Sequence, residues 1–425
     1  MGSLIRFSIR FPGVIIGLAL IVIAYGIYQI KQSPLNVFPE FSPTQVIIQT
    51  ESPGFSSDLV EKLISQPIED AISGTIGIKQ IRSQSIPGLS VVTVIFEEDT
   101  DIYRNRQSIS EKLSLLNGQL PNSINPTITP LTSSASSVLG IGITSKTKTD
   151  SELRTVADTL IVPHLLGVPG VADVNKFGGS VSQLQVEVIP DKLYEHNVTI
   201  AQIINTIQKS TGNVGGGFIE NNNQRIIVNV DGQLKTIDDI RSSPVINSNG
   251  RIIRIKDVAE VKEGFAPSIS AASINGESGV YLSIQGQLGS DTYKLTNQLE
   301  EALNDLAPIL VNQSIELTPD LFKPANFIDA SINGLRFDIL VGSIMVISIL
   351  YLFLFNIKTA FISAIAIPIS LLSAIGMMSY LNLGLNVMVL SGLAIALGEV
   401  VDDAIIDVEN IFRRLKQNKL KKIPL

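Results

Sequence analysis

Three long stretches without a charged residue stand out along this chain, and one long polar segment separates the first from the other two. They cover residues 11–30, 339–357 and 359–398. A helix of about 20 residues spans about 30 Å, the thickness of the hydrocarbon core of a bilayer. The third stretch has about twice that length, and asparagine and glycine interrupt it at residues 380–386, so we expect two helices that fold back on each other. The pattern therefore predicts four transmembrane helices.

The cations beside these helices predict their orientation. Residues 11–30 are too long for the apolar part of a signal peptide, and no small-residue cleavage site follows, so we expect a retained helix. Arg6, Arg10, Lys358 and the basic residues of 413–425 all fall on one side of a four-helix arrangement. Cations near helix ends mark the cytoplasmic side, which places both termini there and residues 32–338 outside, in the periplasm of a Gram-negative cell. Binding of the basic tail to anionic lipid is the alternative role for that tail.

The polar segment begins with alternating strand and helix patterns. Period-two alternation predicts strands, and apolar residues at three- and four-residue spacing predict helices. The expected strands are residues 44–50, 78–84, 89–96 and 126–131, and the expected helices are residues 56–73 and 101–120. The order is βαββαβ, the ferredoxin-like split motif, with a hairpin at Pro87 and Gly88.

A second copy of this motif is predicted with an interruption. Residues 137–144, 151–166 and 171–179 give βαβ, and residues 279–287, 291–310 and 314–320 give βαβ again. Residues 182–267 lie between the two halves and are expected to form a separate β-rich insertion. Within it, Gly215, Gly216 and Gly217 precede an asparagine run and a strand, which indicates a long hairpin arm that reaches a neighbour. A mobile surface loop is the alternative interpretation.

Composition excludes several classes of protein. The chain has 425 residues, of which 45% are hydrophobic and 17% charged, and its mean hydropathy is +0.32. It contains no cysteine and two histidines, so disulfide frameworks, zinc fingers and Cys/His catalytic pairs are excluded. The net charge of −7 argues against a protein that coats nucleic acid. Nothing in the pattern predicts an enzyme, a cofactor or a metal site in this chain.

The last apolar helix carries the most unusual chemistry of the chain. At about 100° per residue, its five acids fall within about 80° on either side of Glu399, so they share one helix face. These acids are Glu399, Asp402, Asp403, Asp407 and Glu409. If the helix begins near Val387, Asp402 lies about 22 Å along it, still inside the hydrocarbon. If it begins near Asn382, the acids lie at the interface and pair with Arg413 and Arg414.

Carboxylates inside a membrane are costly, and such residues pair with cations, face a bundle interior or hold protons. Asp402 and Asp403 are adjacent, and their mutual repulsion favours a shared proton near neutral pH. No lysine or arginine occurs within the uncharged stretches or from Thr359 to Phe412. We therefore expect a proton relay on this acidic face, whose cationic partner comes from another polypeptide or from a second half of a transporter.

Five segments, in order, resemble the resistance-nodulation-division (RND) efflux permeases, and in particular their heavy-metal efflux branch. The segments are PGFSSDLVEKLISQPIEDAISG, LSVVTVIFEEDTDIYRNRQ, GVPGVADVNKFGG, GNVGGGFIE and VDDAIIDVENIFRRL. The resemblance covers nearly the whole chain as the N-terminal half of a twelve-helix permease. It implies that Asp402 and Asp403 are the proton-relay acids and that Glu409 belongs to the VEN element. Glu399 and Asp407 receive no role from it.

The resemblance also implies a division of the chain. It gives an N-terminus with helix one (residues 1–31), a first porter subdomain (32–132), a second porter subdomain (133–181 and 268–336) and a docking insertion (182–267). Helices two to four (337–412) and a basic cytoplasmic tail (413–425) follow. The implied fold class is an α+β membrane protein with a helix bundle, ferredoxin-like porter subdomains and a β-rich docking subdomain.

The implied partners are the second half of the permease, two further protomers of a homotrimer, a periplasmic adaptor and an outer-membrane channel. The expected function is proton-driven export of heavy-metal cations or small toxic compounds from the periplasm, by a permease of the bacterial inner membrane. The paired Asp402 and Asp403 are more typical of the drug-efflux branch, so multidrug export is the alternative. A non-transporting envelope remnant or assembly subunit is the alternative of another class. The chain is interpreted as a truncated reading frame, a split subunit or a shortened form, and the second half would carry most of the substrate pocket.

Overall fold

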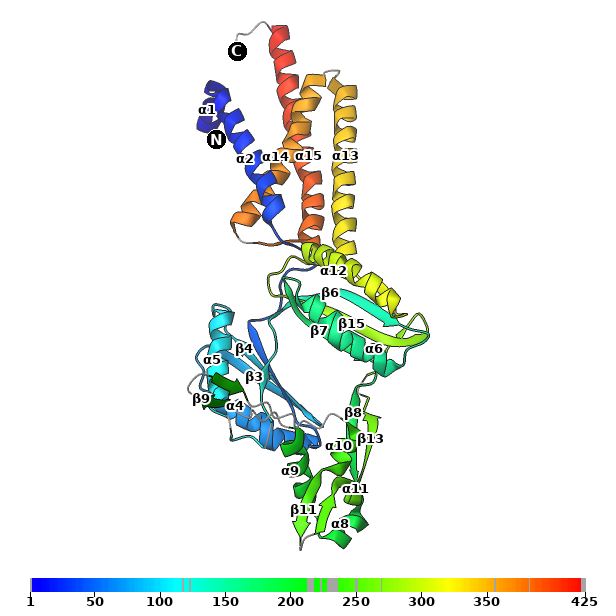
Figure 1. The fold of residues 1–425 in the computed structure, drawn as a ribbon. Helices are drawn as coiled ribbons and strands as arrows, with labels where there is room; N and C mark the ends of the chain where they lie inside the picture. Colours follow the sequence, from blue (N-terminus) through cyan, green and yellow to red (C-terminus); the bar gives the residue numbers. More distant parts are fainter. Residues whose placement is uncertain are drawn as a thin grey trace.

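The computed structural model consists of a helix bundle at one end, two α/β units beside it and a third α/β part beyond them (Figure 1). It describes residues 2–116, 118–121, 124–211, 218–221, 224–227, 236–248, 251–268, 270–354, 357–381 and 383–421. The fold is therefore a mixed α/β fold with a separate layer of long helices, as the sequence pattern predicts.

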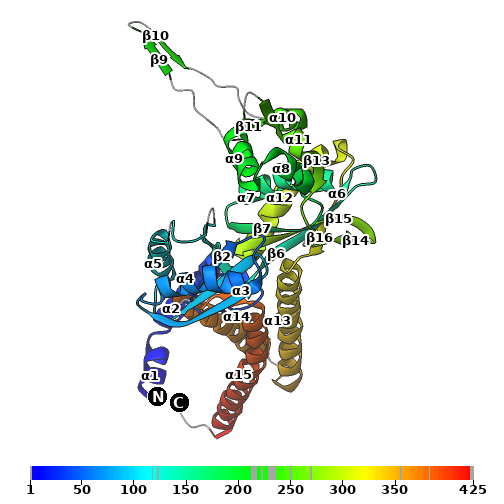
Figure 2. The same ribbon diagram turned by 90° about the horizontal axis from the view of Figure 1, so that it is seen from below.

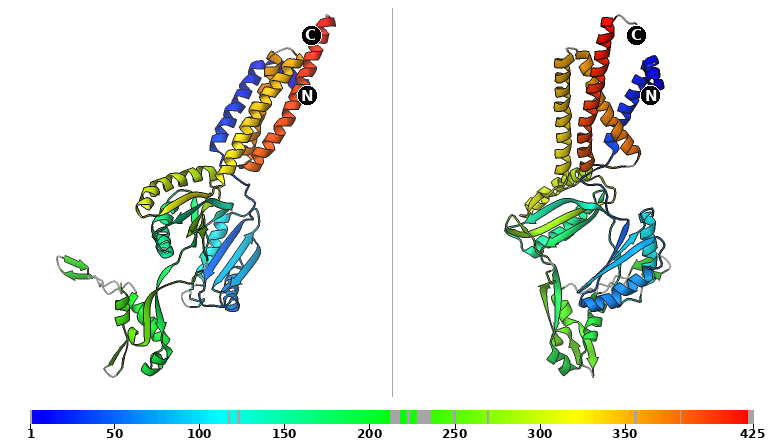
Figure 3. Two further views of the ribbon diagram at one scale, coloured as in Figure 1. Left: turned by 90° about the vertical axis from the view of Figure 1, so that its right-hand side faces the viewer. Right: turned by 180° about the vertical axis from the view of Figure 1, so that it is seen from behind.

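The bundle contains α2 (Pro12–Gln32), α13 (Ala325–Leu354), α14 (Ile357–Tyr380) and α15 (Val387–Lys421), and the short α1 (Gly2–Arg10) precedes it. Helix α14 packs against α2, α13 and α15, and α13 also packs against α15. Helix α14 ends at Tyr380 and α15 begins at Val387, so the predicted break in the third apolar stretch is confirmed. Both ends of the chain lie at the end of the bundle remote from the sheets (Figures 1 and 3).

By length and composition, one helix of the described residues qualifies as a membrane span, over Pro12–Ile30. Shorter apolar runs occur at Ile365–Tyr380 in α14 and Val387–Ala396 in α15. The four long helices are thus present as helices, whereas the prediction that all four cross a membrane stays a prediction.

The first α/β unit has the predicted βαββαβ order. Its elements are β2 (Gln45–Glu51), α3 (Ser57–Val60), the π-helical turn η1 (Glu61–Ser65), α4 (Gln66–Ile72), β3 (Ile78–Ile86), β4 (Leu89–Phe96), α5 (Ile102–Ser114) and β5 (Thr127–Ile128). The antiparallel sheet runs in the order β3-β4-β2-β5. Side chains of β2 and β4 are buried at every second position, and that face packs on Ile64, Ile68 and Ile109 of the helices. The strand periodicity therefore places the core between the sheet and its helices.

The second α/β unit has the same connectivity, interrupted as predicted. Its elements are β6 (Thr132–Thr144), α6 (Asp150–Val156), η2 (Ala157–Ile161), α7 (Val162–Leu166), β7 (Val171–Gly178), β14 (Ser273–Ile274), β15 (Glu277–Gln287), α12 (Thr292–Asn312) and β16 (Glu316–Phe322). Strand β15 lies between β7 and β6, and β16 pairs with the other edge of β6. The two units therefore share one strand order, with β15 in the place that β4 holds in the first unit.

The insertion is not simply β-rich, which corrects the prediction from sequence. It contains β8 (Ser182–Val188), α8 (Pro190–His196), α9 (Ile200–Thr211), β9 (Phe218–Asn221), β10 (Gln224–Ile227), α10 (Ile237–Ser242), β11 (Pro244–Ser248), β12 (Arg251–Arg254), α11 (Ile255–Val258) and β13 (Ala259–Phe265). Helices form because Ile200, Ile203, Ile204 and Ile207 recur at helical spacing. Of these, Ile203 and Ile207 pack in the core of the insertion.

The expected hairpin is present as the antiparallel pair β9–β10, which lies well away from the rest of the chain (Figures 2 and 3). Gly215, Gly216 and Gly217 lie outside the described residues, as does the turn at 222–223. The hairpin is confirmed, and its role as an arm toward a neighbour stays a prediction.

A two-residue parallel ladder joins two chain segments at the base of the bundle. Strand β1 (Leu35–Asn36) follows α2, and strand β17 (Leu385–Asn386) precedes α15. Leu35 pairs with Leu385 and Asn36 with Asn386. The chain segments that leave α2 and enter α15 are therefore held side by side where the bundle meets the α/β units.

Candidate functional site

The start of α15 is fixed by a side-chain cap. Asn386 lies immediately before the helix, and its Oδ1 accepts a hydrogen bond of 3.0 Å from the backbone N–H of Val389. This contact satisfies one of the free N–H groups of the first helical turn, which is the preferred role of asparagine at that position. Leu385 and Asn386 are both buried. Of the two helix starts considered from sequence, the one near Val387 is therefore the one observed.

All five predicted acids lie on this helix. From Val387 the helix rises about 22 Å to Asp402, and its backbone is continuous to Lys421. The helical repeat therefore keeps Glu399, Asp402, Asp403, Asp407 and Glu409 on one face, as the sequence predicts. The side chain of Glu399 is exposed, whereas the surroundings of the other four side chains lie outside what the structure describes.

The cations that follow the acids are placed farther along α15. Arg413 donates a hydrogen bond of 2.7 Å to Oδ1 of Asn410, one turn earlier, and the side chains of Arg413 and Arg414 are exposed. Within the described contacts of α15, the partner of Arg413 is thus an amide and not one of the acids.

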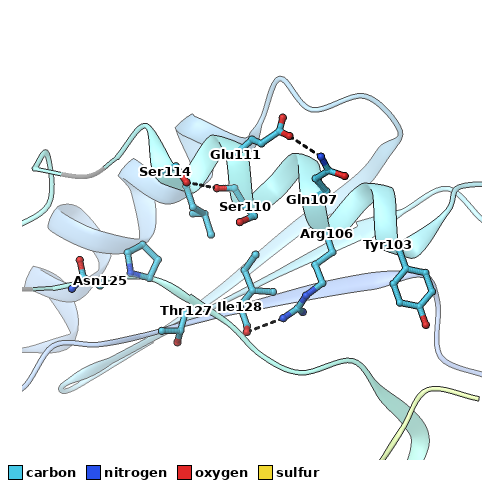
Figure 4. Close-up of a pocket in the computed structure, with 11 residues that line it drawn as sticks. Tyr103, Arg106, Gln107, Ser110, Glu111, Ser114, Asn125, Thr127 and Ile128 are labelled. Carbon is cyan, nitrogen blue, oxygen red and sulfur yellow. Dashed lines mark hydrogen bonds between the residues drawn. The ribbon is translucent and has the colours of Figure 1, made fainter. Parts of the chain in front are cut away.

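The first α/β unit has a hollow that Arg106 helps to line (Figure 4). This hollow was not predicted from the sequence. The hollow has a volume of about 690 Å³ and lies between α5 and the segment that contains β5. From α5, Arg106 donates hydrogen bonds to the backbone carbonyl oxygens of Ile128, at 3.2 Å, and of Thr129. Desolvation lowers the pKa of Arg106 from its usual range, because burial disfavours the charged guanidinium.

A smaller cavity of about 250 Å³ adjoins the same side chains and is bounded by both α/β units. Tyr103 and Arg106 come from the first unit, and Ala172 and Gln287 come from β7 and β15 of the second. Gln287 donates a hydrogen bond of 3.0 Å to the carbonyl oxygen of Val171, which fixes that wall. No signal in the sequence identifies this place, because the carbonyl partners of Arg106 lie 22 and 23 residues away from it and depend on the fold.

The described part of the chain contains no group of three or more histidine, aspartate or glutamate side chains arranged to hold a metal ion. His164 lies in α7 and His196 in α8, in different units of the molecule. The acids of α15 are therefore the titratable cluster for which the sequence supports a function.

Comparisons with known proteins agree on one family. The sequence profile of the AcrB/AcrD/AcrF family matches residues 4–424. Protein HelA of Legionella pneumophila is 31% identical over 98% of this chain and 40% of its own length. The cobalt-zinc-cadmium resistance protein CzcA of Cupriavidus metallidurans is 30% identical over 92% of this chain and 37% of its own length.

A crystal structure of a heavy metal efflux pump superposes on this fold with a TM-score of 0.82 and 28% sequence identity. The superposition covers 97% of this chain and 41% of the pump. The chain thus spans about two fifths of the length of the relatives that it matches. The family match and the heavy metal efflux pump agree with the prediction that this chain is an efflux protein and not an enzyme.

The family profile matches nearly the whole sequence, and the fold of this chain superposes on part of a heavy metal efflux pump. The motifs quoted from the sequence had indicated the same relationship. This chain belongs to the AcrB/AcrD/AcrF family and corresponds to the N-terminal half of RND permeases of the heavy-metal efflux branch.

Proposed function

We propose that this chain forms the N-terminal half of a proton-driven permease of the bacterial inner membrane that exports heavy-metal cations from the periplasm. The names of the relatives support the substrate class. CzcA is a cobalt-zinc-cadmium resistance protein, and CnrA of Cupriavidus metallidurans, 30% identical over 98% of this chain, is a nickel and cobalt resistance protein. CusA of Escherichia coli is a cation efflux system protein. The cargo is accordingly a divalent or soft metal cation.

The acidic face of α15 is the observation that carries proton coupling. A charged aspartate at the centre of a transmembrane helix costs about 2.5–3.5 kcal/mol on insertion scales, so an acid that is kept there needs a partner or a proton. Asp402 and Asp403 lie about 22 Å from the capped start of α15, and the sequence offers no cation between Thr359 and Phe412. Alternate protonation and pairing with a cation from the second half of the permease would move protons through this position.

The proposed topology has α2, α13, α14 and α15 crossing the membrane and both termini in the cytoplasm. The shared position of the two chain ends at the remote end of the bundle supports this arrangement (Figure 1). The two α/β units and the insertion then lie in the periplasm. In this proposal the first unit is one porter subdomain, the second unit is another, and residues 182–267 form the docking subdomain.

The complete transporter is proposed to contain the second half of the permease and to assemble as a homotrimer. A periplasmic adaptor and an outer-membrane channel complete the export path. The isolated position of the β9–β10 hairpin supports contact with a neighbouring protomer. Such a contact would bury a hairpin that otherwise has no core of its own to pack on.

The test of this function uses the complete permease, with its second half, in everted membrane vesicles. Addition of Zn²⁺ or Co²⁺ should release protons from an acidified vesicle, read as recovery of a pH-sensitive dye. Asp403→Asn keeps the size and hydrogen bonding of the side chain but removes its titration, so it should abolish the metal-dependent signal. Asp402→Asn should do the same, because the two carboxylates titrate as a pair.

Glu399→Gln and Asp407→Asn are the controls on the same helix, and they should retain at least about half of the signal if those acids only line the cytoplasmic mouth. Membrane abundance of each variant is measured beside transport. Full metal-driven proton release by the Asp402/Asp403 double variant would refute the relay. A response to cationic dyes but not to metals would favour drug export, and an abundant wild-type protein without any transport would favour a non-transporting envelope protein.

A further inference from the structure

The ladder between β1 and β17 places two asparagines opposite each other. Asn36 pairs with Asn386 across a parallel ladder, and the backbone N–H of Val387 donates to the carbonyl oxygen of Val37 at 3.3 Å. Val37 is buried, and Asn386 is only 5% exposed. The segment after α2 and the segment before α15 therefore form one small, well-packed joint.

The side chain of Asn36 does not bond within this joint. Its Oδ1 accepts from the backbone N–H of Thr292 at 3.2 Å and from the hydroxyl of Thr292 at 2.9 Å. Thr292 is the first residue of α12 and lies 256 residues away from Asn36 along the chain. Asn36 thus satisfies a free N–H group in the first turn of α12, the long helix of the second α/β unit.

Helix α12 also has a cap from Asp291, the residue immediately before it. Asp291 accepts from the backbone N–H of Lys294 at 2.9 Å, and the hydroxyl of the fully buried Thr296 donates to the carbonyl oxygen of Thr292 at 2.8 Å. Loss of the contact from Asn36 would therefore leave the helix formed but no longer attached to the joint. The attachment and the helix can be disturbed separately.

Asn386 makes the equivalent contact on the other side of the joint, because it caps α15 through the N–H of Val389. Two facing asparagines thus each cap a long helix, and the two helices belong to different layers of the molecule. A short ladder of this kind has little freedom to stretch, so a shift at the start of α15 is transferred to the start of α12.

We propose that Asn36 and Asn386 are positioning residues that couple the acid-bearing helix α15 to helix α12 of the second α/β unit. This role rests on the proposed proton relay, since a change in protonation at Asp402 and Asp403 is what would move α15. A second route to α12 runs from α13, where Asp329 binds the hydroxyl of Tyr293 and raises its pKa. The Asn36 contact involves Thr292, the residue next to Tyr293, and a substitution of Asn36 leaves both residues of this second route unchanged.

Hydrogen–deuterium exchange of the complete permease, with its second half present, in lipid nanodiscs tests the coupling. The Asp402→Asn/Asp403→Asn double substitution imitates the protonated state. In an otherwise unchanged chain it should alter exchange at least about twofold in the first turn of α15 and in the first turn of α12, the scale of a partial local opening. Asn36→Leu, which keeps the side-chain size but removes the acceptor, should retain the response of α15 and weaken that of α12, because the second route through α13 remains.

Two variants separate coupling from simple fraying of a helix end. Asn36→Asp keeps an acceptor oxygen at the N-terminus of α12 and should restore the response. Asp291→Ala removes the cap that the residue before α12 supplies, so exchange near Lys294 should rise about fivefold. The response of α12 to neutralisation of Asp402 and Asp403 should nevertheless persist. Loss of the response in Asp291→Ala would assign the effect to fraying and overturn the proposal.

The remaining outcomes separate this proposal from the proposed function. A response of α12 in Asn36→Leu equal to that of the unchanged chain would overturn the link, as would a wild-type background in which α15 responds and α12 does not. In both cases the proton relay would stand. Absence of any response in α15 would instead count against the relay, and the coupling role would fall with it.

Discussion

At the scale of single residues, arginines connect elements of the α/β units through backbone carbonyl groups. Arg106 joins α5 to the segment of Ile128, Arg154 reaches the carbonyl oxygen of Gly178 at 3.0 Å, and Arg241 reaches that of Val261 at 2.8 Å. The planar guanidinium carries five N–H donors, so one side chain serves a strand end and an acid together. Arg154 does so, because its Nε also pairs with Asp158 at 3.1 Å. Each of these arginines thus links a helix to the backbone of a strand.

The start of α6 provides a prediction on pH. Thr149 and Glu152 form a reciprocal cap, in which the carboxylate accepts from the N–H of Thr149 at 2.8 Å and the N–H of Glu152 donates to the Thr149 hydroxyl at 3.3 Å. The backbone hydrogen bond from Thr149, followed by that from its hydroxyl, lowers the pKa of Glu152 below its usual range. The stabilisation is therefore present above the unfolded pKa and is lost as pH falls through the lower, folded pKa.

We expect the amides in the first turn of α6 to lose protection as pH falls below about 4.3, the ordinary pKa of glutamate. Hydrogen exchange between pH 6 and pH 3, corrected for the intrinsic rate, measures this. Glu152→Gln keeps an acceptor without a titrating charge and should remove the pH dependence, whereas Thr149→Ala should weaken the turn by about 1 kcal/mol at neutral pH. An identical pH profile in Glu152→Gln and the unchanged chain would contradict the assignment.

At the scale of elements, the pattern of the sequence predicted both split βαββαβ units and the break before α15. Strands β2 and β4 alternate so regularly that their period determines their buried face. Element ends were less predictable. Helix α5 stops at Ser114 and not near residue 120, and Gly118 follows at φ +81°, a conformation that favours glycine. Strand β5 has two residues and not six, because Pro126 and Pro130 flank it and have no N–H to donate.

The candidate site was predictable to a different degree. The acids of α15 and their shared face follow from spacing alone, whereas the joint at Asn36 does not, because it unites residues 256 positions apart along the chain. Asn36 is one asparagine in a short polar stretch, and only the pairing of β1 with β17 gives it a place. The helices of the insertion were not predicted, because the Asn and Gly residues around 212–223 favour turns.

The proposed membrane topology of the long helices can be tested with single introduced cysteines. The chain has no cysteine, so an introduced cysteine is the only thiol and its labelling reports its side of the membrane. Cysteines at Ser3 in α1 and at Gln417 in α15 should be protected from an impermeant thiol reagent in spheroplasts. Tyr194→Cys in α8 should be labelled, because Tyr194 is 90% exposed on the proposed periplasmic side.

Permeabilised cells provide the control for reactivity, and all three cysteines should be labelled there. Labelling at Gln417 in sealed spheroplasts would contradict a four-span arrangement with both termini in the cytoplasm. Labelling at Ser3 alone would instead show that α2 does not hold the N-terminus inside.

At the scale of the whole molecule, the described hairpin β9–β10 has no sheet or core beneath it. Its strands pair only with each other, over Phe218–Asn221 and Gln224–Ile227. A two-stranded hairpin on its own is marginally stable in water, so its position away from the units favours burial against another molecule (Figure 2). In the proposed homotrimer that molecule is the next protomer.

Removal of residues 215–223 from the complete permease deletes strand β9 and the glycines before it, so it should weaken the trimer. Each protomer would lose a contact in a ring of three, so we expect the dissociation constant to rise at least about tenfold, or about 1.4 kcal/mol. The trimer fraction is measured by native mass spectrometry over a dilution series. The matched control replaces Asn221, Asn222 and Asn223 by serine, which keeps the length of the arm and should leave the trimer fraction unchanged. An equal trimer fraction in the shortened and unchanged permeases would show that the hairpin does not hold protomers together, and its partner would then be sought among the other proteins of the export path.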